Sequence, residues 1–259
     1  MRRRGHASAS RGLRLRKAAL VSIAGLVCLT SWCVPACTQE STSLGGVQSF
    51  AFSTTYSPSS SHILIGDAEQ RRVWTLGAQY THRLRQTPQF RLDYEGSIMP
   101  VYEETDPAVV GTIFSFSGQS FFTPLAPTRL IYAVRGPVGS VIQKNGSVTP
   151  ITAVLTRQNT YAAALSPLGV RISAFPRSRI QPGFALDLGF VVSARDIPVD
   201  QTAQFNYMFS FGPGFEVFAS PRTSWRFEYI YRHTSNAGQG VLNPGVDQGV
   251  VRITLSHSR

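Results

Sequence analysis

Short segments in which apolar and polar residues alternate recur along this chain. In one of the clearest, Trp225, Phe227 and Tyr229 share one parity. Arg226 and Glu228 share the other. A period of two predicts a β-strand with one apolar and one polar face. We therefore expect an all-β chain with eight such strands, centred on residues 50–56, 74–84, 90–98, 168–172, 184–192, 205–211, 224–232 and 247–255.

The apolar face of these segments is rich in Phe, Tyr and Trp, whereas the other face is polar and small. Strands that combine an aromatic outward face with a polar inward face are typical of outer-membrane barrels. The pattern predicts an eight-stranded antiparallel transmembrane β-barrel. A soluble β-sandwich or lipocalin-like barrel is the alternative, in which the aromatic face would form the core.

The lengths of the connections predict which end of the barrel faces outward. Short turns at residues 86–88, 177–181 and 220–223 are expected to be periplasmic, because periplasmic turns are short in such barrels. The longer outer loops are expected at residues 57–71, about 103–160 and 234–246. The connection at 197–200 is short for an outer loop. Within the long 103–160 insertion, Asn145-Gly146 is a sequence that favours a hairpin turn.

The N-terminal 36 residues have the features of an export signal. They contain seven basic residues and no acidic residue, and an apolar run extends from Ala18 to Leu29. Val34 and Ala36 then form a small-residue cleavage site. The run is too short to span a membrane comfortably, so a membrane anchor is the less favoured alternative. We expect 1–36 to be a signal peptide and 37–259 a single barrel domain.

Removal of this signal changes the interpretation of charge. The whole chain has 25 basic and 14 acidic residues, a formal net charge of +11. Without the seven basic residues of the signal, 18 remain against 14, a net charge of +4. That balance does not indicate nucleic-acid binding, and no nucleic-acid-binding motif is present. We expect no nucleic-acid partner.

The cysteines and histidines give no indication of a metal or cofactor site. Cys28, Cys33 and Cys37 all lie in or beside the signal, so the mature chain retains at most Cys37. This excludes a disulfide framework. Lipidation of Cys37 is a minority alternative. The histidines are scattered without metal-ligand spacing, and we expect no metal and no organic cofactor.

The connection between the last two strands contains the residue types of an acyl-transfer site. Such a site needs a hydroxyl, an imidazole that accepts its proton, a carboxylate that orients the imidazole, and hydrogen-bond donors for an oxyanion. His233, Ser235 and Asp247 lie within fifteen residues, with Asn236 and Asn243 between them. The alternative is an ordinary hairpin loop, in which Ser, Asn, Gly and Asp are common.

Strand parity favours the catalytic interpretation. His233 and Ser235 continue the aromatic parity of their strand, which places them about 6–7 Å apart along the backbone. Asp247 lies on the apolar parity of the last strand, and antiparallel pairing would bring it within about 5 Å of His233. All three would lie on the lipid-facing wall at the outer end of the barrel. Polar groups that face lipid cost free energy, so their presence indicates a function. On this face, the function would be chemistry on a lipid.

The motif His233-Thr234-Ser235-Asn236-Ala237-Gly238, followed by Asn243-Pro244-Gly245, resembles the lipid A 3-O-deacylases, a PagL-like, acyloxyacyl hydrolase-like outer-membrane family. The resemblance extends to residues 166–171 and 204–214. It implies an eight-stranded outer-membrane barrel that removes the ester-linked acyl chain at the 3-position of lipid A. It also implies that Ser235 is the nucleophile and His233 the general base. Asp247 replaces an acid that is commonly Glu in the family.

The same resemblance assigns supporting roles to four loop residues. Asn236 and Asn243 match positions linked to the oxyanion hole and to site geometry, and Gly238 and Gly245 would permit a tight loop. The implied partners are the acyl chains of lipid A or lipopolysaccharide in the outer membrane of the cell. A non-catalytic barrel that binds lipid or has a structural role is the alternative. The sequence leaves open whether the chain forms a homodimer.

Overall fold

The computed structural model describes residues 44–259, and these residues form ten β-strands. All strand pairs are antiparallel. In this part of the chain no helix is long and apolar enough to span a membrane. The predicted signal peptide at 1–36 and Cys37 lie outside the described residues. The strands are β1 (Gln48–Ser57), β2 (Arg72–Gln86), β3 (Phe90–Phe116), β4 (Gln119–Arg129), β5 (Gly139–Ile142), β6 (Val148–Ala174), β7 (Ile180–Ile197), β8 (Ala203–Phe218), β9 (Thr223–Ser235) and β10 (Val246–Ser258).

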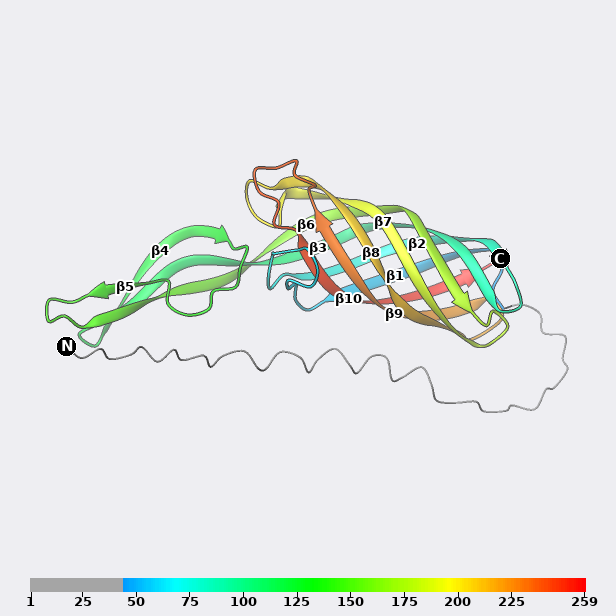
Figure 1. Cartoon of the computed structure of the whole chain (residues 1–259), viewed down its shortest axis with the longest axis horizontal. Coiled ribbons are helices and arrows are strands. Elements are labelled where there is room, and N and C mark those ends of the chain that lie inside the picture. Colours follow the sequence, from blue (N-terminus) through cyan, green and yellow to red (C-terminus); the bar gives the residue numbers. More distant parts are fainter. Residues whose placement is uncertain (1–43) are drawn as a thin grey trace, which may run out of the picture. The chain divides into compact units, whose positions relative to one another are not determined.

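Eight of these strands form a closed ring. Each strand pairs with its neighbour in the order β3-β2-β1-β10-β9-β8-β7-β6, and β3 also pairs with β6. The last pairing joins the two ends of the order, so the sheet closes into a barrel (Figure 1). The prediction of an eight-stranded antiparallel barrel is confirmed. Closure leaves no unpaired edge in the ring, which is what a sheet in lipid requires.

The side chains have the inside-out distribution of a membrane barrel. On β1, Phe50, Phe52 and Tyr56 are exposed, by 63%, 73% and 49%, whereas Ala51, Ser53 and Thr55 on the opposite parity are buried. The same alternation holds around the ring, where outward positions are mostly aromatic or aliphatic and inward positions mostly polar or charged. This distribution suits a barrel surrounded by lipid. The alternative of a soluble barrel with an aromatic core is wrong.

Ion pairs fill the interior of the barrel. Glu228 on β9 contacts Arg171 on β6 and Arg252 on β10, and Arg252 also binds Asp187 on β7 at 2.9 Å. Arg91 binds Glu216 across the barrel at 2.6 Å. An eight-stranded barrel is just wide enough for side chains to fill it. The interior is therefore packed by paired charges that cross-link strands far apart in the sequence.

The connections agree with the predicted orientation. Short turns at 87–89, 175–179 and 219–222 lie at the end of the barrel that carries the C-terminus, the end predicted to be periplasmic (Figure 1). The loops 58–71 and 236–245 lie at the outer end. The 198–202 connection is short for an outer loop, as its sequence indicates.

The segment expected to be a long outer loop is mostly strand. β3 and β6 are 27 residues each and continue beyond the barrel as an antiparallel pair, with β4 on the outer edge of β3 and β5 beside β6 (Figure 1). The expected hairpin at Asn145-Gly146 is confirmed, because β5 and β6 pair on either side of it and Gly146 has a φ of 81°. The insertion is thus a β-sheet arm on the outer end.

Candidate active site

The candidate site lies where β9 ends and β10 begins. In the register of this pair, His233 is directly opposite Asp247 and Thr234 is opposite Val246. On its other side β9 pairs with β8, where Phe209 is opposite His233 and Tyr207 is opposite Ser235. The pairing therefore brings His233 and Asp247 together on the outward parity of neighbouring strands.

His233 and Asp247 are in direct contact. The Nδ1 atom of His233 lies 2.6 Å from Oδ1 of Asp247, a hydrogen-bond distance typical of a charged acceptor. A carboxylate bound at Nδ1 fixes the ring so that Nε2 is left to exchange a proton. These two residues thus have the geometry of a base and the acid that orients it.

Neighbouring groups bury this pair although it lies on the outward parity of the strands. His233 is only 5% exposed and Asp247 is 0% exposed. The ring of Phe209 packs against the His233 ring with centroids 5.2 Å apart, and the backbone of residues 61–68 crosses over residues 244–247. A hydrogen bond to a carboxylate is stronger in such surroundings than in water. The His233–Asp247 pair is therefore covered by neighbouring groups, although it lies on the barrel wall.

Ser235 lies two residues from His233 on the same strand parity and is half-buried. Among the residues that the structure describes, its hydroxyl has no hydrogen-bond partner, and no hydrogen bond joins it to His233. Catalytic hydrogen bonds of this kind are often long before substrate binds. The hydroxyl thus lies on the same strand face as the imidazole, two residues along, and is not engaged elsewhere among the described residues.

Asn236 closes the loop that follows Ser235. Its Oδ1 accepts a hydrogen bond from the Gly238 amide at 2.9 Å, and its Nδ2 donates to the Leu242 carbonyl at 2.8 Å. Its backbone amide donates to Oδ1 of Asn243 at 3.2 Å. Because Oδ1 of Asn243 is the acceptor in that bond, its Nδ2 is the free end of the amide. Asn243 therefore offers a side-chain donor beside the site.

Gly245 allows the loop to pass close to the imidazole. Its φ of 60° is in the left-handed region, and a Cβ built on it would lie 2.8 Å from Cε1 of His233. Gly238 has a φ of 79° with open space around it. Both glycines therefore meet a conformational need, and Gly245 also meets a steric one.

Three donors to Asp247 were not predicted from the sequence. The backbone amides of Leu64 and Ile65 donate to its Oδ2 at 2.6 and 2.9 Å, and the Tyr231 hydroxyl donates to its Oδ1 at 2.7 Å. Tyr231 could have been found from parity, because it lies two residues before His233 on the same face. The two amides carry no sequence signal, because every residue except proline has one.

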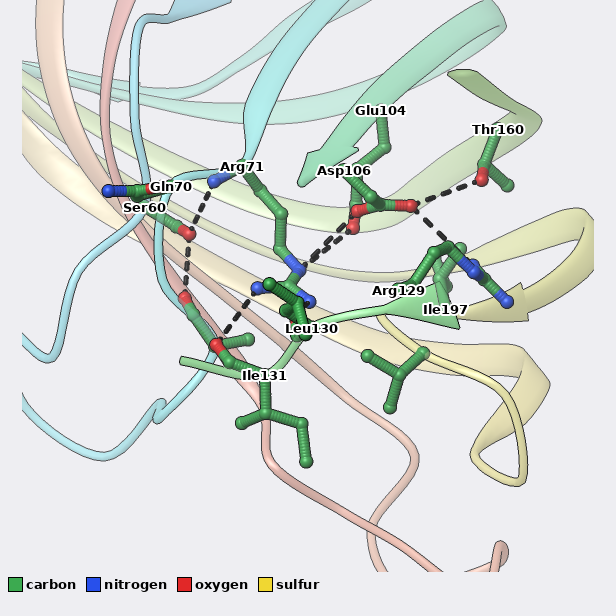
Figure 2. A network of polar contacts seen from close by, with 12 residues as sticks. Ser60, Gln70, Arg71, Glu104, Asp106, Arg129, Leu130, Ile131, Thr160 and Ile197 are labelled. Atoms are coloured by element: carbon green, nitrogen blue, oxygen red, sulfur yellow. Dashed lines mark hydrogen bonds and ion pairs between the residues drawn. The ribbon is translucent and has the colours of Figure 1, made fainter. Parts of the chain in front are cut away.

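A second polar cluster lies at the outer mouth of the barrel (Figure 2). The buried Arg71 guanidinium lies between Asp106 and Glu104, with Nε 3.4 and 3.8 Å from their carboxylates. Arg129 also contacts Asp106, and Thr160 donates to it at 3.3 Å. Burial lowers the pKa of Arg71 below its ordinary value, and the neighbouring Asp106 and Glu104 carboxylates oppose that shift. This cluster closes the mouth with charged groups.

The described residues contain no group of three or more His, Cys, Asp or Glu side chains that could hold a metal ion. The side chains gathered at the site are instead a hydroxyl, an imidazole, a carboxylate and two amides. These are the types of group that acyl-transfer sites use as nucleophile, base, orienting acid and oxyanion donors.

No family model and no curated protein sequence matches the chain. Several solved structures are similar to it, among them three outer-membrane proteins. The outer membrane enzyme PagL is 11% identical with a TM-score of 0.46, and the match covers 81% of this chain and 99% of that one. Neisserial surface protein A is 8% identical with a TM-score of 0.40 and coverages of 83% and 99%. The outer membrane protein OprG from Pseudomonas aeruginosa is 11% identical with a TM-score of 0.38 and coverages of 83% and 97%.

The three solved structures differ in what their names describe, since one is an enzyme and the other two are named only as surface or outer-membrane proteins. The assignment of this chain as a transmembrane barrel rests on its own strand pairing and on its apolar outer surface. Its function has to be inferred from the groups at the end of β9.

Proposed function

We propose that this protein is an outer-membrane lipid esterase that removes the 3-O-linked acyl chain of lipid A. The observation that carries the proposal is the 2.6 Å contact between His233 and Asp247, with the Ser235 hydroxyl two residues along on the same face. The resemblance of the motif around Ser235 to the lipid A 3-O-deacylases supports the choice of substrate.

The surroundings of the site favour a lipid substrate. Ile63, Leu64 and Ile65 are about half exposed beside Asp247, and Val241 is 83% exposed on the loop that follows Ser235. Aromatic side chains continue this apolar surface down the barrel wall. A water-soluble substrate would gain nothing from such a rim, whereas an acyl chain can leave the bilayer without crossing water.

In this mechanism the Ser235 oxygen attacks the ester carbonyl while Nε2 of His233 accepts the hydroxyl proton. Asp247 stabilises the imidazolium that forms, and Nδ2 of Asn243 donates to the oxyanion. The imidazolium then donates its proton to the departing sugar oxygen, which leaves an acyl-enzyme. A water molecule attacks that ester while His233 accepts its proton, and His233 then returns the proton to the Ser235 oxygen as the bond to the acyl group breaks and the fatty acid is released.

The test is to express the wild type and Ser235→Ala in a host with fully acylated lipid A and to measure lipid A by mass spectrometry. Loss of one hydroxyacyl chain is expected with the wild type and not with Ser235→Ala. Ser140→Ala, an exposed serine on β5, is the matched control and should behave as wild type. Identical lipid A with and without the Ser235 hydroxyl, with both barrels in the outer membrane, would overturn the proposal.

A further inference from the structure

The outer loop at residues 58–71 is fastened to the start of β10. The Ser61 amide donates to the Asp247 carbonyl at 3.2 Å, and the Asp67 and Ala68 amides donate to the Pro244 and Gly245 carbonyls at 2.6 and 3.0 Å. Ser60 also forms a β-bridge with Gln248. The loop is therefore held by backbone hydrogen bonds on both sides of Asp247.

The tip of this loop binds the carboxylate oxygen of Asp247 that His233 and Tyr231 do not bind. His233 and Tyr231 bind Oδ1 from β9, whereas the Leu64 and Ile65 amides bind Oδ2 from the loop. Both oxygens are thus engaged, and rotation of the carboxylate would break bonds on one side or the other. Asp is one methylene shorter than Glu, so backbone amides must approach closely to reach it.

Gly66 makes this approach possible. A Cβ built on Gly66 would lie 2.6 Å from the Asp247 amide nitrogen and 2.9 Å from Cγ of Asp247. Real Cβ atoms do not approach other atoms so closely, and the neighbours here are backbone and a short side chain with little room to move. Any larger residue at this position would displace the loop from Asp247.

Arg71 holds the loop from inside the mouth of the barrel (Figure 2). Its Nη1 donates to the Glu69 and Ile131 carbonyls at 2.7 and 3.2 Å, and its Nη2 donates to the Leu130 carbonyl. Its backbone amide donates at 3.0 Å to Oγ of Ser60, which itself donates to the Ala68 carbonyl at 2.6 Å. One buried side chain and one serine thus join the two ends of the loop.

We infer that this loop is part of the esterase site: the Leu64 and Ile65 amides are a clamp that orients Asp247, and Arg71 is the positioning residue that holds the clamp in place. The inference rests on the proposed function, and the groups that it names, two backbone amides and one guanidinium, act on Asp247 and not on the substrate. Through Arg71, the buried charges at the mouth of the barrel are connected to Asp247. Leu130 and Ile131, which follow β4 of the β-sheet arm, are connected to Asp247 in the same way.

The first variant to measure is Gly66→Ala, assayed with p-nitrophenyl decanoate in detergent micelles. A displaced clamp leaves Asp247 free to rotate, so we expect kcat to fall about a hundredfold, the cost of a displacement of about 1 Å. The KM value should change much less than kcat, because the two amides bind Asp247 and only the exposed Leu64 and Ile65 side chains face the substrate. Gly139→Ala is the matched control, since its new Cβ would meet only Ile151 at 3.4 Å, and it should keep the wild-type kcat.

The pH profile separates positioning from a general loss of structure. The titratable groups around His233 are Asp247 on β10, Tyr231 on β9, and the exposed His62 and Asp67 of the loop. Without two of its donors, Asp247 turns away from His233, so the imidazolium form of His233 loses the carboxylate that stabilises it. The imidazole is then harder to protonate, and the acid limb of kcat/KM is expected to move to lower pH in Gly66→Ala. A merely structural defect lowers activity equally at every pH.

Arg71→Lys tests the other end of the clamp. Lysine keeps the positive charge between Glu104 and Asp106 but cannot reproduce the planar set of donors to three carbonyls. We expect the same fall in kcat and the same direction of the pH shift as in Gly66→Ala, with heat-modifiable gel migration that shows a folded barrel. Wild-type kcat and pH profiles in both variants would overturn the inference.

Hydrogen exchange tests the clamp without using activity. The peptide that contains Leu64 and Ile65 should exchange slowly in the wild type and at least tenfold faster in Gly66→Ala. Equal rates in the two proteins would overturn the clamp, whether or not the protein hydrolyses esters. A wild type that is protected in this peptide but inactive on every ester would overturn the proposed function, and with it the positioning role.

Discussion

At the scale of single residues, Gly245 sets the distance between the loop and the imidazole. Gly245→Ala would place a methyl group 2.8 Å from Cε1 of His233, so the ring must turn away from Asp247 or the loop must move. We expect kcat on p-nitrophenyl decanoate to fall about a hundredfold, which is the loss expected when a catalytic group is displaced by about 1 Å. The left-handed φ adds a stability cost of about 1 kcal/mol.

Gly146→Ala is the matched control for this backbone cost. Gly146 has a φ of 81° and nothing within 4 Å of a built Cβ, and it lies on the arm between β5 and β6. It should therefore show the same small loss of stability with wild-type kcat. Equal activities of the two variants would mean that contact with His233 does not matter.

The residues of the candidate site divide into those that sequence can predict and those that it cannot. His233 and Asp247 follow from strand parity, because a period of two fixes which side chains share a face and antiparallel pairing brings the two strands together. The Leu64 and Ile65 amides come from a loop more than 180 residues earlier in the chain. Their contribution depends on the path of the backbone, which side-chain patterns do not encode.

At the scale of strands, alternation predicted the ring better than it predicted the arm. The eight barrel strands alternate because one face meets lipid and the other meets buried charges. In the arm, both faces of β3 and β4 are partly exposed, so no strict alternation is required. Pro107, Pro124 and Pro127 also argue against strands, since a proline cannot donate to the sheet. Pro124 and Pro127 are tolerated because β4 is an edge strand.

Strands β6, β9 and β10 are joined through one carboxylate. Glu228→Gln would keep the shape of the side chain but leave Arg171 and Arg252 with less negative charge in a buried space. Removal of one partner from a buried ion pair is expected to cost about 3–5 kcal/mol. The urea midpoint of the folded band in lipid vesicles, measured by heat-modifiable gel migration, should fall clearly below that of the wild type.

The matched control for Glu228 is Glu103→Gln. Glu103 lies on β3, is partly exposed, and has no ion pair among the residues that the structure describes. Its urea midpoint should equal that of the wild type within error. If both variants unfolded at the wild-type midpoint, the interior ion pairs would contribute nothing to the stability of the barrel.

At the scale of the whole molecule, the balance of buried charge explains why side chains can fill the lumen of the barrel. Among the described residues, seven arginines and eight carboxylates are buried, and one of these carboxylates is Asp247 on the outer surface. The remaining seven carboxylates match the seven arginines. Six of the seven arginines form ion pairs with these carboxylates, and side chains fill the interior of an eight-stranded barrel.

This closed interior predicts that the protein does not conduct ions. In planar lipid bilayers the purified barrel should produce no stable conductance steps at any applied voltage. Arg91, Arg226, Arg252 and their partners occupy the lumen of the barrel. Arg71 and Arg129 occupy its outer mouth. A water-filled porin measured under the same conditions provides the positive control. Steady steps from the wild type that disappear when the protein is heat-denatured would contradict the packed interior. They would also indicate a channel, whereas the esterase proposal requires only the outer surface of the barrel.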